Sequence, residues 1–182
     1  MTEKLGFEID PGTAFGTATH PTTVLCIELI ECYLEQGNEF LDVGTGSGIL
    51  MVAAAKLGAG KICGIDKNIA AVEIARRNLR LNQIEEKRFE VKAGNLVDDV
   101  QVQFDLVVAN ILTEVMVVLL DSIKKVLKKT GVFICSGMLE KNTHRVEKKI
   151  IGSGFEILEI RTKNKWVAIA ARLKYLQDID YR

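Results

Sequence analysis

The sequence feature that most constrains the fold is a run of alternating glycines between an apolar segment and a helix-forming one. Residues 40–49 read FLDVGTGSGI, which places Gly44, Gly46 and Gly48 just before ILMVAAAKL. Glycine permits backbone conformations closed to residues with a Cβ, and it lets a ligand lie against the backbone. The start of the following helix presents unpaired N–H groups, which favour an electron-rich or anionic ligand. We therefore expect a strand, a tight turn and a helix that bind a nucleotide-like ligand.

The spacing of these glycines narrows the kind of nucleotide. A dinucleotide fingerprint has the form G-x-G-x-x-G, whereas here the third glycine comes one residue early and Asp42 lies two residues before the first. The resulting D-x-G-x-G-x-G run resembles motif I of the class I S-adenosylmethionine-dependent methyltransferases. That resemblance implies a site for a methionine tail and a nucleoside. A purely structural turn is the alternative, because glycine-rich turns between strand and helix occur in many α/β proteins.

The composition favours one folded domain. With 182 residues, 48% of them hydrophobic and only two prolines, the chain can bury one sizeable core but is short for two domains. We expect a single domain over residues 1–182, with an N-terminal loop and helix (1–37), an α/β core (38–172) and a polar tail (173–182). Twenty-four Lys plus Arg balance twenty-four Asp plus Glu. This balance disfavours general nucleic-acid binding.

The cysteines and the apolar runs bear on the cellular compartment. The four cysteines lie in apolar stretches with no C-x-x-C pair and no clustered histidines, so we expect small buried side chains in a reduced compartment and no metal site. No apolar run approaches the roughly 18 residues of a membrane helix, and the N-terminus lacks a targeting pattern. We expect a cytoplasmic protein that does not bind membranes. Its oligomeric state is not predicted.

Beyond the glycine turn, hydrophobic patterns and turn signals alternate between strands and helices, which predicts an α/β fold. The run FDLVVANIL is almost continuously apolar, as in a strand buried on both faces, and the C-terminal part of the chain reads as a closing hairpin. The expected strands cover residues 39–43, 61–65, 88–92, 104–112, 132–136 and two segments within 154–173. The expected helices cover 21–35, 49–57, 68–82, 113–129 and 140–151.

Three polar residues lie at or just after the ends of predicted strands, at the edge where ligands bind in an open α/β sheet. Asp66 can accept hydrogen bonds from both hydroxyls of a ribose, or it can cap the next helix, a role that Asn68 can equally fill. Asn95 stands where many class I methyltransferases carry an Asp against the adenine amino group, and an amide can also pair with an adenine edge. Asn110 lies where chemistry is expected, or it caps the next helix, as Thr113 also could.

A second resemblance covers most of the chain. DPGTAFGTATHPTT (10–23) is very similar to the segment before motif I in the ribosomal protein L11 methyltransferases, and NIL (110–112), SGML (136–139) and the closing GFE…WVA hairpin match the same family. It implies a Rossmann-like class I fold: a seven-stranded, mostly parallel sheet with a C-terminal antiparallel hairpin and helices on both faces. One departure is Ala18, where the family usually has glycine.

The resemblance also implies roles for individual residues. Phe15, Thr17, His20 and Thr22 would line the cofactor or acceptor side, and Asn110 would orient the acceptor nitrogen. His20 is the one candidate general base, or it braces the loop against the first helix. The cofactor-binding set implied in full is Phe15, Thr17, Thr22, Asp42, Gly44, Gly46, Gly48, Asp66, Asn95 and Asn110.

The implied activity is methyl transfer from S-adenosylmethionine to amino groups of a protein, with a ribosomal protein as one candidate acceptor. Family members normally carry a further N-terminal domain that docks the ribosomal protein, so this sequence is either a fragment or an enzyme with another acceptor. The alternatives are a stand-alone N-methyltransferase for a small molecule or another protein, and a non-catalytic cofactor-binding subunit. A nicotinamide dehydrogenase is disfavoured by the glycine spacing.

Overall fold

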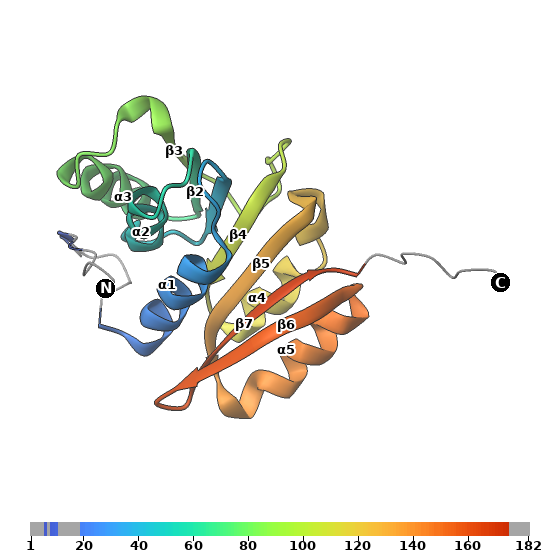
Figure 1. Cartoon of the computed structure of the whole chain (residues 1–182). Coiled ribbons are helices and arrows are strands. Elements are labelled where there is room, and N and C mark those ends of the chain that lie inside the picture. Colours follow the sequence, from blue (N-terminus) through green and yellow to red (C-terminus); the bar gives the residue numbers. More distant parts are fainter. Residues whose placement is uncertain (1–5, 7, 11–18, 175–182) are drawn as a thin grey trace.

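The computed structural model describes residues 6, 8–10 and 19–174, which form one seven-stranded sheet between two layers of helices (Figure 1). Phe15, Thr17 and Ala18 lie outside the described residues. The strands are β1 (Glu39–Val43), β2 (Lys61–Asp66), β3 (Phe89–Ala93), β4 (Phe104–Asn110), β5 (Leu127–Leu139), β6 (Phe155–Lys163) and β7 (Trp166–Leu173). The helices are α1 (Pro21–Tyr33), α2 (Ile49–Lys56), α3 (Ile69–Leu81), α4 (Thr113–Leu119) and α5 (Glu140–Gly152), with short 3₁₀ turns η1 (Glu86–Arg88) and η2 (Ile123–Lys125).

The strand order in the sheet is β3-β2-β1-β4-β5-β7-β6. Strands β1 to β5 are parallel, whereas β7 runs antiparallel to both β5 and β6. The predicted mostly parallel sheet with a closing antiparallel hairpin is therefore confirmed. The chain reverses its direction of travel across the sheet between β1 and β4. In open α/β sheets, ligands bind outside the carboxyl ends of the strands at such a switch point.

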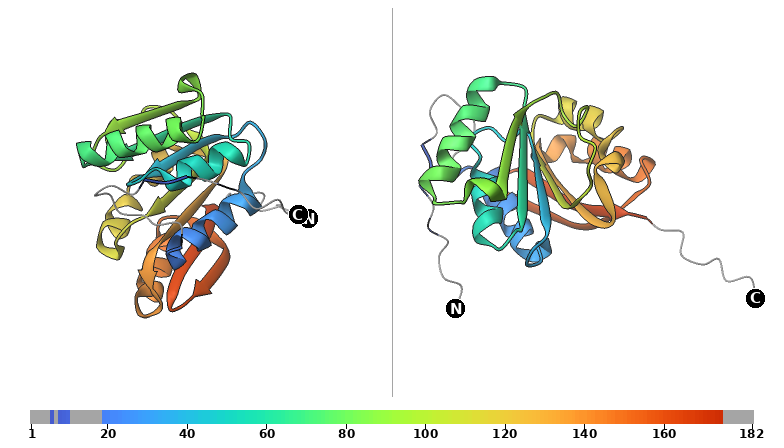
Figure 2. Two further views of the ribbon diagram at one scale, coloured as in Figure 1. Left: turned by 90° about the vertical axis from the view of Figure 1, so that its left-hand side faces the viewer. Right: turned by 90° about the horizontal axis from the view of Figure 1, so that it is seen from above.

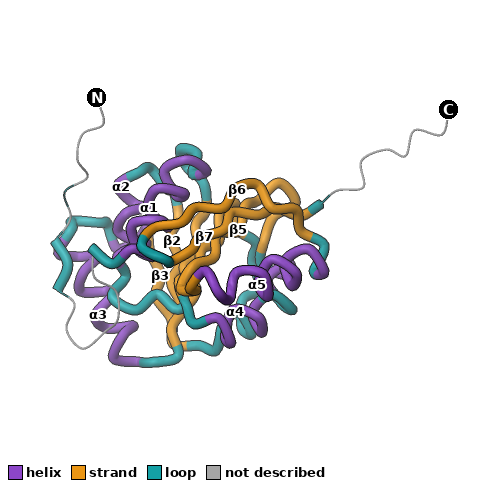
Figure 3. Tube along the Cα trace, turned by 90° about the horizontal axis from the view of Figure 1, so that it is seen from below, coloured by secondary structure: helices purple, strands orange, loops and turns teal. Residues whose placement is uncertain are grey.

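Two apolar layers hold the sheet between the helices. Helices α1, α2 and α3 cover one face, and α4 with α5 cover the other, as Figures 2 and 3 show from further directions. On β1, the side chain of Phe40 belongs to the first buried cluster and that of Leu41 to the second, as the two-residue period of a strand requires. Residues 106–109 of β4 are fully buried. This confirms the expectation of a strand buried on both faces.

The helix expected over residues 113–129 is wrong in its second half. Helix α4 ends at Leu119, η2 follows, and β5 begins at Leu127, five residues before the predicted strand. Leu127 lies opposite Phe104 in the sheet, and Lys128 contacts the carboxylates of Glu39 and Asp105. These tertiary contacts outweigh the helical propensity of the Lys-rich run, so Lys128 belongs to strand β5 and not to a helix.

Other boundaries differ by one to three residues: α1 ends at Tyr33, α2 at Lys56, and β3 starts at Phe89. Such shifts are normal for helix and strand ends. The cysteine expectation holds for Cys26, Cys63 and Cys135, which are buried, but is wrong for Cys32. That thiol is exposed near the end of α1, where a guanidinium N–H of Arg161 donates to its Sγ at 3.3 Å. None of the helices in the described ranges is long and apolar enough to cross a membrane.

Candidate cofactor and acceptor site

The glycine turn after β1 has the backbone geometry that its sequence predicts. The φ angles of Gly44, Gly46 and Gly48 are +76°, +53° and +77°, all in the left-handed region that disfavours side chains. A Cβ on Gly44 would come within 2.5 Å of Cγ2 of Ile111. One on Gly48 would come within 2.9 Å of the Cβ of Ala75. The turn is thus closely packed from both sides, by the end of β4 and by α3.

Beneath this turn, Asp42 is a buried acid with a free acceptor. Its side chain is only 1% exposed, and Oδ2 accepts a hydrogen bond from Oγ1 of Thr45 at 2.8 Å. Oδ1 has no hydrogen-bond partner among the described residues. Burial raises the pKa of Asp42 to about 7, and the nearby Asp66 carboxylate adds to the rise. A buried acceptor without a partner is costly, which makes Asp42 a candidate contact for a donor or cation at the turn.

Asp66 is the last residue of β2, and its side chain is hydrogen-bonded to the glycine turn. Its Oδ2 accepts from the backbone N–H of Gly46 and its Oδ1 from that of Asn68, both at 2.9 Å. Asn68, not Asp66, caps α3, because its own side chain accepts from the N–H of Ala70. The capping explanation of Asp66 is therefore excluded. Each carboxylate oxygen retains acceptor capacity, and binding of a ribose by Asp66 stays a prediction.

Asn110 ends β4 and points to the start of α1, 88 residues earlier in the chain. Its Nδ2 donates to Oγ1 of Thr22 at 3.1 Å. It does not cap α4, whose N-cap is Leu112 with no side-chain bond, and Thr113 is the first residue of that helix. The capping explanation of Asn110 is thus wrong, and the residue is instead part of a contact between β4 and α1.

His20 caps α1 and completes this contact. Its Nδ1 lies 2.7 Å from Oγ1 of Thr22 and 3.4 Å from the Thr22 backbone N–H. Because the backbone N–H can only donate, Nδ1 is the acceptor, and a neutral ring carries its proton on Nε2. The His20 ring also packs edge-on against Trp166, with centroids 5.0 Å apart. His20 thus contacts α1 and β7, whereas most of the loop that it would brace lies outside the described residues. The bracing role and the general-base role both stay predictions.

This chain of bonds fixes which end of the Asn110 amide faces away from Thr22. The Thr22 hydroxyl donates its single proton to His20, so it must accept from Asn110. The donor is therefore the Asn110 NH₂ group. The carbonyl oxygen of Asn110 is left as the acceptor for a group at the end of β4.

The sheet register brings these groups to one edge. Val43 lies opposite both Ile65 and Ala109, so the glycine turn, Asp66 and Asn110 follow neighbouring strand ends. A close approach between β5 and the backbone just after Asn110 helps to position Asn110. Gly137 has φ +93°, and a Cβ there would come within 2.2 Å of the carbonyl oxygen of Ile111. The glycine of the SGML segment thus admits the backbone that follows Asn110.

The predicted adenine contact, Asn95, is hydrogen-bonded within its own turn. Asn95, after β3, is exposed, and its Nδ2 donates to Oδ2 of Asp98 at 2.8 Å within its own turn. Its adenine role stays a prediction. Phe15 and Thr17 belong to residues that the structure does not describe. The second histidine of the chain, His144, is exposed on α5.

Sequence reasoning missed Asn78, a fully buried amide on α3 that donates to the carbonyl oxygen of Ser47 inside the glycine turn at 2.8 Å. A signal for it exists. Asn78 falls on the apolar stripe of α3, in register with Ala71, Ile74 and Ala75, although Asn is a poor residue for a helix interior. The edge-on partner of His20, Trp166, was also missed, and no local pattern connects the two.

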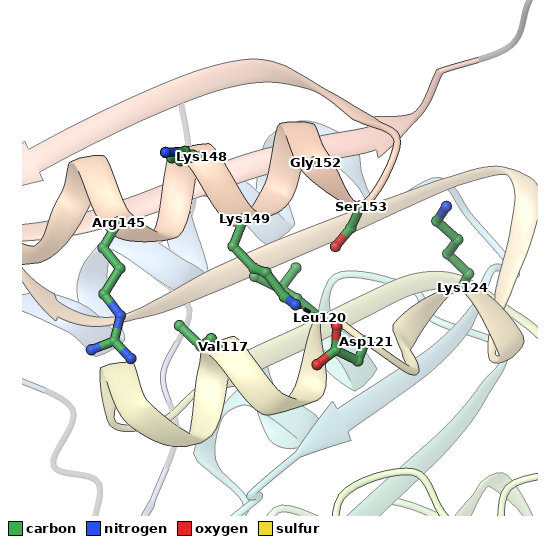
Figure 4. A pocket seen from close by; sticks show the side chains of 9 residues that line it. All are labelled: Val117, Leu120, Asp121, Lys124, Arg145, Lys148, Lys149, Gly152 and Ser153. Atoms are coloured by element: carbon green, nitrogen blue, oxygen red, sulfur yellow. Dashed lines mark hydrogen bonds and ion pairs between the residues drawn. The ribbon is translucent and has the colours of Figure 1, made fainter.

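A hollow of about 620 Å³ lies away from these strand ends, between α4 and α5 (Figure 4). Its lining includes Val117, Leu120, Lys124 and Arg145, and Lys149 points across it to an ion pair with Asp121. It contains none of the predicted site residues. In the parts of the chain that are described, no group of three or more His, Cys, Asp or Glu side chains could hold a metal ion.

Comparison with known proteins gives the family. The profile described as "Ribosomal protein L11 methyltransferase (PrmA)" matches residues 1–174. The chain belongs to the ribosomal protein L11 methyltransferase family. A ribosomal protein L11 methyltransferase of Desulfosudis oleivorans is 47% identical over 167 residues, which are 91% of this chain and 55% of that protein. One of Bacillus licheniformis is 44% identical over 171 residues, or 94% of this chain and 55% of that protein.

The fold agrees with this family. A crystal structure of a ribosomal protein L11 methylase from Lactobacillus delbrueckii subsp. bulgaricus superposes with a TM-score of 0.86 at 34% identity, over 92% of this chain and 84% of that one. The chain spans about half the length of the L11 methyltransferase sequences above. The matched half contains the glycine turn, Asp66 and Asn110, so the family resemblance covers the whole candidate site.

Proposed function

We propose that this chain is the S-adenosylmethionine-dependent catalytic part of a protein methyltransferase, and that its acceptor is an amino group of a ribosomal protein of the L11 type. The observation that carries the proposal is the meeting of the glycine turn, Asp66 and Asn110 at the switch point of the sheet. Membership of the L11 methyltransferase family supports it. Residues 38–172 would be the α/β core of this single catalytic domain, and a cytoplasmic location fits the three buried thiols.

The residues at the turn fit S-adenosylmethionine. The unpartnered Oδ1 of Asp42 suits a cationic or donor group, and the left-handed glycines leave backbone without Cβ atoms for close approach. The Asp66 carboxylate is held by two backbone N–H groups and can accept from vicinal hydroxyls. Gly44, Gly46, Gly48, Asp66 and Asp42 would thus hold the cofactor, with Asn95 near the base. The bound cofactor supplies a methyl group on a positively charged sulfur.

The protein's task in this reaction is alignment. An amine attacks in line only when it is neutral and its lone pair is aimed, and such alignment can supply on the order of 7–11 kcal/mol. Desolvation and a nearby positive charge both lower the pKa of an acceptor amine from roughly 10.4. The carbonyl oxygen of Asn110, oriented through Thr22 and His20, can accept an amine N–H and turn the lone pair. A dedicated base is not required, and His20 would act mainly through Thr22.

The proposal is tested first by calorimetric titration with S-adenosylmethionine, S-adenosylhomocysteine and NAD. We expect binding of the first two and none of NAD, and binding of NAD alone would exclude a methyltransferase. Transfer of a labelled methyl group is then measured with purified ribosomal protein L11 as acceptor, in parallel with serum albumin. Labelling of L11 alone is the expected result. Cofactor binding without any transfer would instead support a non-catalytic cofactor-binding subunit.

A further inference from the structure

The described segment at residues 8–10 lies along α3 and is held there by two asparagines one helical turn apart. The Asn78 amide donates to the carbonyl oxygen of Asp10 at 2.9 Å and accepts from its N–H at 3.0 Å. The Asn82 amide does the same for Glu8, at 2.6 and 3.1 Å. Each side-chain amide thus pairs with both backbone groups of one residue, as a neighbouring strand would. Residues 8–10 are therefore held by two side chains, one from α3 and one from its C-cap residue, Asn82.

Asn78 differs from Asn82 in having a second contact. Its Nδ2 also donates to the carbonyl oxygen of Ser47, at 2.8 Å, and the side chain is fully buried. Ala75, almost one turn earlier on the same face, is the residue that a Cβ on Gly48 would strike. The Asn82 amide instead donates to the backbone oxygen of Asn78. Of these two asparagines, Asn78 is the one that joins the N-terminal segment to the glycine turn.

We propose that Asn78 is a positioning residue for cofactor binding, which couples order at residues 8–10 to the conformation of the glycine turn. The inference rests on the proposed function. One NH₂ group carries two hydrogens, and here one binds Ser47 and the other Asp10. When either carbonyl holds the amide in place, orienting it for the other costs less conformational entropy. A ligand that orders the turn therefore also orders residues 8–10, and the coupling is reciprocal.

The test compares Asn78→Ala with the matched variant Asn82→Ala, which loses the same kind of clamp without the Ser47 bond. Affinity for S-adenosylhomocysteine is measured by calorimetry well below each unfolding midpoint. Amide hydrogen exchange at Glu8 and Asp10 is followed by NMR with and without this ligand. In the wild type we expect the ligand to slow exchange at Asp10. Asn78→Ala should weaken affinity about tenfold, the scale of one or two net hydrogen bonds, and abolish the ligand effect at Asp10.

The control outcome separates positioning from stability. Asn82→Ala should keep its affinity within about twofold, since it makes no bond to the turn, while exchange at Glu8 becomes faster. If wild type and Asn78→Ala bind equally well, or if the ligand leaves wild-type Asp10 exchange unchanged, the inference is wrong and the proposed function stands. If the wild type does not bind S-adenosylhomocysteine at all, both are wrong. Should Asn78→Ala not fold, the wild-type exchange experiment decides by itself.

Discussion

At the scale of single residues, the site consists of polar groups whose orientation is set by other protein groups. The amide of Asn110 is turned by Thr22, the hydroxyl of Thr22 by His20, and the carboxylate of Asp66 by two backbone N–H groups. Prior orientation of this kind lowers the cost of aligning reactants. The predictions at this scale therefore concern the loss of orientation as well as the loss of contact.

Replacing Asn110 by Ala should lower kcat for methyl transfer about a hundredfold, because misplacing the acceptor by even ~1 Å has effects of that size. Affinity for S-adenosylhomocysteine should change less than about twofold, since the proposed contact is to the acceptor. Thr22→Val removes only the hydroxyl that turns the amide, so we expect a smaller loss of kcat, of about tenfold. The measurements are steady-state methyl transfer to L11 and calorimetry.

The matched control for Thr22→Val is Thr23→Val, which alters the next residue of α1, equally 1% exposed. It should leave kcat near the wild-type value. If both valine variants lose the same activity, the effect comes from α1 packing and the orienting role of Thr22 is wrong.

Asp66→Ala should weaken binding of S-adenosylhomocysteine by roughly 1.5–3 kcal/mol, the scale for hydrogen bonds to a charged group. The variant also releases the N–H of Gly46 from its carboxylate partner. Asp66→Asn separates the two effects because its carbonyl can still accept from one N–H group. An unchanged affinity in both variants would remove Asp66 from the cofactor site.

Asp42 predicts a pH dependence of stability. Its pKa is raised to about 7 in the folded protein, above the value near 3.9 of an unfolded chain. The folded state therefore holds this proton more tightly, and the resulting stability is present at low pH and is lost as pH rises toward about 7. Between pH 5 and 8 the loss from this group is up to about 2–3 kcal/mol.

Asp42→Asn keeps the shape and removes the titration, so the variant should gain stability relative to wild type as pH rises from 5 to 8. Urea unfolding of the unliganded proteins at both pH values measures this difference. Parallel pH profiles for the two proteins would show that Asp42 is already ionised without cost in the folded state.

At the scale of secondary-structure elements, close contacts between turns and helices decide where glycine is required. Gly48 combines a left-handed φ of +77° with a neighbour, Ala75, whose Cα would lie 3.0 Å from an added Cβ. Gly152, the last residue of α5, has no atom within 4 Å of an added Cβ. The two glycines therefore form a natural pair for a substitution experiment.

Gly48→Ala should destabilise the protein by about 1–3 kcal/mol, through backbone strain and displacement of α3. Gly152→Ala should be neutral or stabilise it by up to about 1 kcal/mol, because alanine favours a helix more than glycine does. Chemical unfolding with a constant m-value is the measurement. Equal effects at the two positions would mean that α3 moves to accommodate the extra methyl group at no cost.

At the scale of the whole molecule, the sequence predicted those features of the fold that depend on interactions between residues close together in the chain. The apolar run of β4, the glycine turn and the order of strands and helices follow from periodicity and backbone restrictions, and the structure has them. The end of α4 could not be predicted from local patterns. Leu127 and Lys128 were expected to be helical, but they contact residues of β4 and β1 that are distant in the sequence. The contacts of Asn78 and Trp166 were missed for the same reason: their partners are distant in the chain.

The bond between Asn110 and Thr22 also has a consequence for the order in which the site assembles. The glycine turn and Asp66 come from 25 consecutive residues, 42–66, whereas Asn110 is oriented by a residue 88 positions away. Contacts over long chain separations carry a larger loop-closure cost and tend to form late. We expect a refolding chain to regain affinity for S-adenosylhomocysteine before it regains methyl transfer, which stopped-flow binding and interrupted-refolding activity assays can time against each other. The recovery of methyl transfer would then mark the time at which α1 packs against the end of β4.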